Sequence, residues 1–238
     1  MSYGIEIKNP LGYVQLDDSH SQFQILEITT ITPVFCSWID DLGTVPLYCY
    51  GLTVTTNDLY FVRLDNTAGY IGSQIGGNWV YPSANLLLLA TANTPLTIIK
   101  CKKSTTLPNV TTGYHLNIYN TSSELVFSSA YNNVSIVSAN MYNNSAFYYD
   151  STNSASLPTP NLLANYKRCL LLNYLPCVTA MVVDSEHGAP PDILFNVMGK
   201  YNSSSAIHFK SIPNRNVVPN FYTNFPGTFT AIIGDLIW

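Results

Sequence analysis

Apolar residues occupy every second position in many short segments of the chain, and this spacing predicts β-strands with one buried face. The pattern is clear in "YGIEIKNPLGYVQLDD" (3–18) and returns in "YHLNIYNTSSELVFSS" (114–129). In each segment a polar turn opened by Asn, Asn9 or Asn120, separates two alternating runs. Each segment therefore predicts a β-hairpin, and the apolar run that follows it predicts a third strand.

The two segments match at a constant offset of 111 residues, without a gap. The matched pairs include Tyr3 with Tyr114, Ile5 with Leu116, Ile7 with Ile118, Asn9 with Asn120 and Ile25 with Ile136. Alternation alone recurs easily by chance, but the matched Tyr and Asn favour an internal duplication. The duplication predicts two successive β units in one chain.

The polar segment "KKSTTLPNVTTG" (102–113) lies between the two units and has the composition of a linker. We predict a first β-sandwich domain at 1–103, a linker at 104–111 and a second β-sandwich domain at 112–238. The fold class expected is all-β, with two tandem antiparallel β-sandwich-like domains and a duplicated N-terminal β-hairpin. Two segments are less regular: 161–175 predicts a short helical turn entering a strand, and the glycine-rich 69–77 predicts a flexible hairpin tip.

Charged residues make up only 10% of the chain, against roughly 25% in an average soluble protein. Their place is taken by uncharged polar and aromatic residues, with 24 Asn and 17 Tyr. Such a surface favours close contact with neighbouring subunits, although an ordinary β-rich extracellular-type domain has a similar composition. The net charge of −4 and the lack of a basic stripe argue against a nucleic-acid groove. Lys100, Lys102 and Lys103 form the one cationic cluster, which is expected in a solvated loop.

The chain opens with no signal-peptide pattern, and its longest apolar run is too short to span a bilayer. We therefore expect synthesis in a cytoplasm and no membrane insertion. The five cysteines are scattered and form no C-x-x-C pair, so buried free thiols are expected instead of a disulfide framework or zinc site.

Residues 184–187, Asp-Ser-Glu-His, form the densest polar group. Neighbouring residues on one turn cannot converge as a catalytic triad, and no second His stands at a metal-ligand spacing. We predict no catalytic residue, no cofactor site and no metal site, and expect that the chain is not an enzyme. A hydrolase with carboxylates that meet only in space is the enzymatic alternative.

Aromatic residues set among Asn and Ser form the candidate interaction surface. They are Trp79, Tyr81, Tyr142, Phe147, Tyr148, Tyr149, Phe221 and Tyr222. Such groups suit a sugar face or a protein neighbour, and they also close the ends of ordinary sandwiches, so both interpretations stay open.

The opening stretch resembles small virion proteins of tailed bacteriophages, which commonly begin "MSYGLEV.N..G" and carry a "YGL.VFN..GELVFDS" unit further along. The matching residues here are Tyr3, Gly4, Ile5, Ile7, Asn9 and Gly12, then Tyr114, Leu116, Ile118, Asn120, Glu124, Leu125, Val126, Phe127 and Ser129. This chain has His115, Ser123 and Ser128 where the second unit usually has Gly, Gly and Asp.

The resemblance implies a non-enzymatic structural component of the tail tip, baseplate or fibre region, assembled in the host cytoplasm and located in the virion. Its partners would be other virion proteins and copies of itself, in a homo-oligomeric ring or trimer. The alternatives are a carbohydrate- or receptor-binding module of the virion, with a host-surface glycan as partner, and a capsid decoration protein.

Overall fold

The computed structural model describes the strands and most of the connections between them. The described residues are 6–8, 14–17, 22–38, 45–65, 67–78, 80–143, 154–159, 162, 166–173, 175, 177–181, 192–203, 206–214 and 228–237. Within these ranges every regular element is a β-strand except one 3-10 turn, η1 (Ser104–Thr106). The predicted all-β class is confirmed. None of the described residues belongs to a helix with the length and apolar character needed to cross a bilayer.

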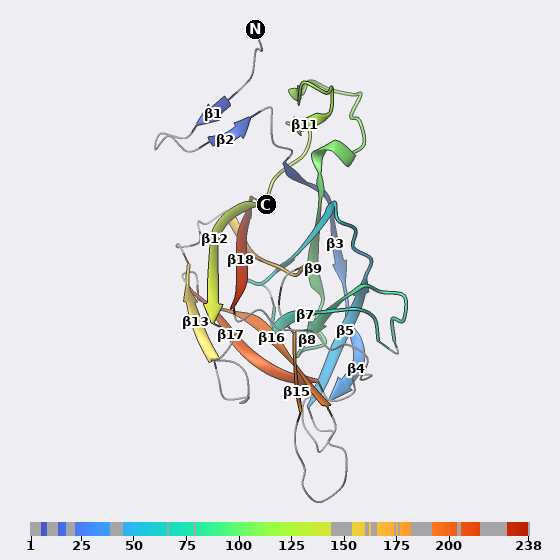
Figure 1. Cartoon of the computed structure of the whole chain (residues 1–238), viewed down its shortest axis with the longest axis vertical. Helices are drawn as coiled ribbons and strands as arrows, with labels where there is room; N and C mark the ends of the chain where they lie inside the picture. The colour runs from blue at the N-terminus through green and yellow to red at the C-terminus, as the bar shows by residue number, and fades with distance from the viewer. Residues whose placement is uncertain are drawn as a thin grey trace, which may run out of the picture.

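Six strands form one antiparallel sheet in the order β12-β18-β14-β6-β9-β3 (Figure 1). Their bounds are β3 (Phe23–Ile31), β6 (Asp58–Arg63), β9 (Leu96–Lys103), β12 (Ser135–Asn143), β14 (Tyr166–Leu171) and β18 (Thr228–Ile237).

Eight strands form the second sheet in the order β13-β17-β16-β7-β8-β5-β4, with β15 also paired to β16. Their bounds are β4 (Val34–Trp38), β5 (Pro46–Leu52), β7 (Ile71–Ile75), β8 (Leu86–Ala90), β13 (Ser154–Pro158), β15 (Cys177–Met181), β16 (Asp192–Ser203) and β17 (Ala206–Asn214).

The two hairpins predicted from the repeat are present, and they lie toward the same end of the molecule (Figure 1). One pairs β1 (Glu6–Lys8) with β2 (Val14–Asp17), and the other pairs β10 (Asn117–Tyr119) with β11 (Leu125–Ser128). Ile7 faces Leu16 in the first hairpin, and Ile118 faces Phe127 in the second, so the registers agree at the offset of the sequence repeat. A bulge follows Ile7 and Ile118 alike.

The structural repeat continues through the six-stranded sheet. β3 pairs with β9 in the same register as β12 with β18, and the bulge after Ile25 recurs after Ile136. β6 pairs with β9 as β14 pairs with β18. The sheet therefore consists of two equivalent halves, β3-β9-β6 and β12-β18-β14, that meet where Phe61 of β6 faces Leu171 of β14.

The second sheet crosses the same boundary, because β7 of the first half pairs with β16 of the second at Ile71 and Gly199. The predicted domains 1–103 and 112–238 each supply an equivalent set of strands. Those strands form continuous sheets across the boundary instead of two separate sandwiches joined only by residues 104–111. Hydrophobic alternation shows which face of a strand is buried but not which strand lies beside it, so this fusion could not be read from the pattern.

An apolar core lies between the two sheets, with contributions from both halves. Its fully buried members include Val62 and Leu170 of the six-stranded sheet and Leu88, Val197 and Phe209 of the eight-stranded sheet. The opposite face of the six-stranded sheet surrounds a second cluster, which contains Phe61 and Leu171. This sheet curls around the cluster, and its edge strand β3 contacts the segment that leads into the opposite edge strand, β12, because Ile25 N–H donates to Asn132 O at 2.7 Å. Both faces of β6 and β14 are thereby buried where the two strands meet, which explains the consecutive apolar residues 59–62 of β6 and 169–171 of β14.

The strand assignments show that the predictions for the lysine cluster and for the glycine-rich segment were wrong. The cationic cluster is not in a solvated loop, because Lys100 and Lys102 belong to β9 and lie 4.0 and 3.9 Å from the Asp58 carboxylate. The glycine-rich segment is not a hairpin tip, because most of it forms the buried strand β7 at the centre of its sheet. A Cβ on Gly72 would lie 2.6 Å from the Met198 side chain, so the glycine permits close packing of the two halves.

Candidate functional site

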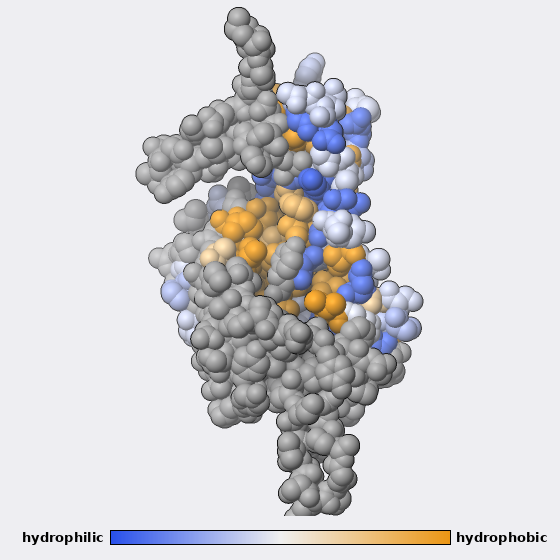
Figure 2. All heavy atoms as spheres, in the orientation of Figure 1, coloured by the Kyte–Doolittle hydropathy of each residue, from blue (hydrophilic) through white to orange (hydrophobic). Residues whose placement is uncertain are grey.

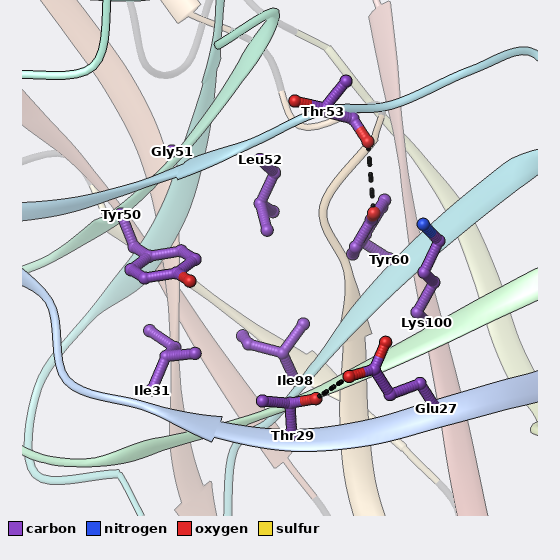
Figure 3. A pocket seen from close by; sticks show the side chains of 10 residues that line it. All are labelled: Glu27, Thr29, Ile31, Tyr50, Gly51, Leu52, Thr53, Tyr60, Ile98 and Lys100. Carbon is purple, nitrogen blue, oxygen red and sulfur yellow. Dashed lines mark hydrogen bonds between the residues drawn. The ribbon is translucent and has the colours of Figure 1, made fainter.

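A pocket of about 290 Å³ opens between the two sheets in the first half of the molecule (Figure 3). β3, β6 and β9 line it from one sheet and β5 from the other. It lies at the edge of the six-stranded sheet formed by β3, where four consecutive residues, 27–30, are exposed.

The interior of the pocket is apolar and aromatic. Ile31, Leu52 and Ile98 project into it, with the Tyr50 ring beside them (Figure 3). Tyr60 forms another part of the wall, and its hydroxyl donates to the Thr53 carbonyl oxygen at 3.1 Å. This bond holds the Tyr60 ring in one orientation, so the wall is preformed.

The mouth of the pocket carries one acid and one base. The Glu27 carboxylate accepts a hydrogen bond from the Thr29 hydroxyl at 2.7 Å. The Lys100 ammonium lies 5.4 Å from the centroid of the Tyr60 ring, within the range of a cation–π contact. Its interaction with the Tyr60 side chain, aided by the charges of Asp58 and Glu27, raises the pKa of Lys100, so this group stays cationic at neutral pH.

Asp58 lies behind this mouth and is almost fully buried. Its Oδ2 accepts hydrogen bonds from the Thr55 N–H at 3.1 Å and the Thr55 hydroxyl at 2.9 Å. Its Oδ1 is buried and receives no hydrogen bond, and its two lysine neighbours are at ion-pair distance only. The carboxylate therefore contributes negative potential behind the pocket without fixing either ammonium in place.

Of the predicted interaction residues, the structure describes the side chain of Tyr81 only. Its ring is half-buried over the backbone of Gly51, where an added Cβ would lie 2.7 Å from the ring. The centroids of the Tyr81 and Tyr50 rings are 5.7 Å apart, and burial raises the pKa of the Tyr81 hydroxyl. Tyr81 thus packs near a pocket residue without being among the residues that line the pocket.

Tyr142 lies on β12, and only its backbone is described. The others lie outside the described residues: Trp79, Phe147, Tyr148, Tyr149, Phe221 and Tyr222. The polar group at 184–187 also lies outside them.

The described part of the chain holds no group of three His, Cys, Asp or Glu side chains that could bind a metal ion. Four cysteines, Cys36, Cys49, Cys101 and Cys169, are buried thiols that form no disulfide, as the sequence predicts. Cys36 and Cys49 interact across neighbouring strands: the hydrogen bond between them, with a second from Asn78 to Cys49 Sγ at 3.3 Å, lowers the pKa of Cys49. The same contact and burial raise the pKa of Cys36.

The hairpin β10-β11 exposes large apolar side chains. Ile118 and Val126 are buried in a small cluster of its own, whereas Tyr114, Leu116 and Tyr119 are exposed. Apolar surface also gathers below the hairpin end on the face shown in Figure 2. In a chain with so few charged residues, such surfaces are candidates for contact with other protein subunits.

Comparison with protein-family models finds no matching family, and neither the curated proteins nor the solved structures yield a match.

The pocket has no signature in the sequence. Glu27, Tyr50 and Tyr60 stand in ordinary strand patterns, and Lys100 belongs to a cluster of lysines that is typical of a solvated loop. One feature of the sequence does favour a strand here: Lys100 and Lys102 alternate with apolar residues in "LTIIKCKK" (96–103). This alternation is typical of a strand and not of a loop.

Proposed function

We propose that this protein is a non-enzymatic structural subunit of a bacteriophage virion, in the tail-tip, baseplate or fibre region. It acts through contacts with copies of itself and with other virion proteins, and it is assembled in the host cytoplasm. The sequence resemblance of the duplicated hairpin suggests the particle, and the low charge of the chain suits permanent subunit contacts.

One observation carries the proposal: the repeated hairpin exposes Tyr114, Leu116 and Tyr119, while Ile118 and Val126 already fill its own core. A hairpin that needed only to close one end of the sandwich would bury these side chains against the sheets. Their exposure fits an element that contacts another subunit.

Sedimentation velocity of the purified full chain over a range of concentrations tests the proposal. We expect an oligomer in which the double variant Leu116→Glu/Tyr119→Glu dissociates, because buried charges without partners oppose association. Thr121→Glu/Ser122→Glu is the matched control, since it adds the same two charges to the exposed turn of the same hairpin. A wild-type chain that stays monomeric at every concentration would contradict self-assembly.

Mass spectrometry of purified virions and cryo-electron microscopy of the particle test the location. A position in the tail agrees with the proposal, a position on the head selects the capsid-decoration alternative, and absence from the particle rejects both. The receptor-binding alternative requires a ligand site, and the pocket of the first half is the observation that favours it.

A further inference from the structure

The repeat provides an internal comparison for the pocket. From the strand registers, Tyr60 is equivalent to Leu170, and Lys100 is equivalent to Ile233. Leu170 and Ile233 are both fully buried in the core between the sheets. The fold therefore accommodates aliphatic side chains at these two positions, and the first half has an aromatic hydroxyl and an ammonium there instead.

The two halves differ in the same way at Glu27, because its equivalent in β12 is the uncharged Ser138. The acid and the base at the mouth are thus confined to one half of the duplicated sheet. Their positions beside a preformed cavity are not explained by the requirements of the fold, which the other half meets without them.

An ion pair with Asp58 does not explain why a lysine occupies position 100 either. Its ammonium is 4.0 Å from Asp58 Oδ2, which is too far for a hydrogen bond, and Lys102 lies 3.9 Å from Oδ1 of the same carboxylate. In the second half the equivalent of Asp58 is Arg168, whose Nε donates to Asp235 Oδ1 at 2.6 Å in a close ion pair. An ammonium carries three donors, so Lys100 keeps hydrogen-bonding capacity toward the pocket.

From this juxtaposition we infer that the pocket bounded by Glu27, Tyr50, Tyr60 and Lys100 binds a neutral saccharide. With one acid and one base, the mouth carries little net charge, which disfavours a simple ion. Glu27 accepts hydrogen bonds and Lys100 donates them, and a sugar hydroxyl can satisfy either group. The C–H face of a pyranose ring is apolar and fits against the Tyr50 ring and the aliphatic floor.

The size of the cavity limits the ligand. Its volume of about 290 Å³ lies at the lower end of the range of small-molecule sites, so it accepts one or two sugar rings of a longer glycan. The inference does not require the chain to be a virion subunit, and saccharide binding and particle location are measured separately.

Saturation-transfer difference NMR on the full chain tests the inference, with methyl glycosides of neutral hexoses, pentoses and N-acetylhexosamines as probes. We expect transfer to the ring protons of at least one probe. Lys100→Ile and Tyr60→Leu, which introduce the residues of the second half, should weaken binding at least about tenfold. Glu27→Ser also introduces the residue of the second half and should also weaken binding. Because Glu27 is exposed, this variant tests the site even where a buried variant fails to fold. Lys103→Ala, on the same strand but not among the residues lining the pocket, should bind as wild type does.

Failure of every glycoside to show transfer would overturn the inference, and so would equal binding by the wild type and Glu27→Ser. A zwitterionic amino acid such as L-alanine could also match one acid and one base. Transfer to L-alanine in the absence of transfer to the glycosides would therefore also reject the saccharide.

Discussion

At the scale of single residues, the two halves differ in the geometry of a buried ion pair that occupies equivalent positions in each. Arg168 is fully buried, pairs with Asp235 and donates a further hydrogen bond to the Thr159 hydroxyl. At the equivalent positions Asp58 and Lys102 carry the opposite charges, 3.9 Å apart. The duplication has thus kept a cross-strand ion pair while exchanging its signs, and only the pair in the second half has close hydrogen-bond geometry.

Replacing Arg168 by Met should destabilise the protein by about 3–5 kcal/mol, because Asp235 would remain buried without its partner. Lys102→Met removes the looser, partly exposed partner and should cost less than about 1 kcal/mol. Urea denaturation of both variants measures the difference in the free energy of unfolding. Equal losses would show that the two pairs contribute alike.

The buried thiols predict a loss of stability in alkaline solution. Burial raises the pKa of Cys101 from 9.0 to about 12, so the folded state disfavours the thiolate. The contribution of this group is complete below the unfolded pKa and is lost as the pH rises from about 9 toward 12, because the unfolded chain releases the proton first. Cys101→Val should therefore reduce the fall in melting temperature over this interval, as followed by circular dichroism. Curves of identical slope for the two proteins would contradict the assignment.

At the scale of elements, a buried glutamine forms two of the hydrogen bonds that join the second hairpin to the first half. The Gln24 side-chain amide donates to Ser128 O at 2.7 Å and accepts from Ser128 N–H at 2.9 Å, which reproduces the bonds of a strand neighbour. Ser104 completes the contact by donating its hydroxyl to Val126 O at 2.7 Å. Hairpin β10-β11 therefore bridges the end of the first half and the start of β12 in the second.

Gln24→Ala should loosen this hairpin by about 1–3 kcal/mol, because the Ser128 N–H and C=O would lose their partners. Hydrogen exchange of the Ser128 amide should then become at least about tenfold faster. Gln22→Ala is the control, since Gln22 contacts the hairpin through its backbone N–H, which donates to Val126 O. Unchanged exchange in Gln24→Ala would show that other contacts hold the hairpin.

The hairpins were predictable from the sequence because a hairpin is local, and alternation with an Asn turn specifies both strands. The strand β7 was not predictable in the same way. Its sequence, "IGSQI", contains a glycine and two polar residues, and its burial depends on pairing with the next strand, β8, on one side and with β16, from the distant second half, on the other. The partner β16 lies outside any local window of sequence, so the pattern around β7 does not predict its central place in the sheet.

At the scale of the whole molecule, the duplication produces one body with two continuous sheets. The repeat and its offset were readable from matched residues such as Tyr3 and Tyr114. The pairing that joins the two halves was not readable, because the apolar sequence of β6 does not indicate that β14 lies beside it. The pocket was hidden for the same reason, since its residues come from four strands of two sheets and meet only when the first half is assembled.

The measurement that tests this architecture most directly is a nuclear Overhauser effect between the α-protons of Phe61 and Leu171 in isotopically labelled protein. Leu172 N–H donates to Tyr60 O at 2.8 Å, so Phe61 and Leu171 form the close, non-hydrogen-bonded type of antiparallel pair. Their Cα atoms should be about 4.5 Å apart, and the cross-peak should be strong. Its absence, with β6 and β14 showing contacts only to β9 and β18 respectively, would mean that the two halves are separate sandwiches.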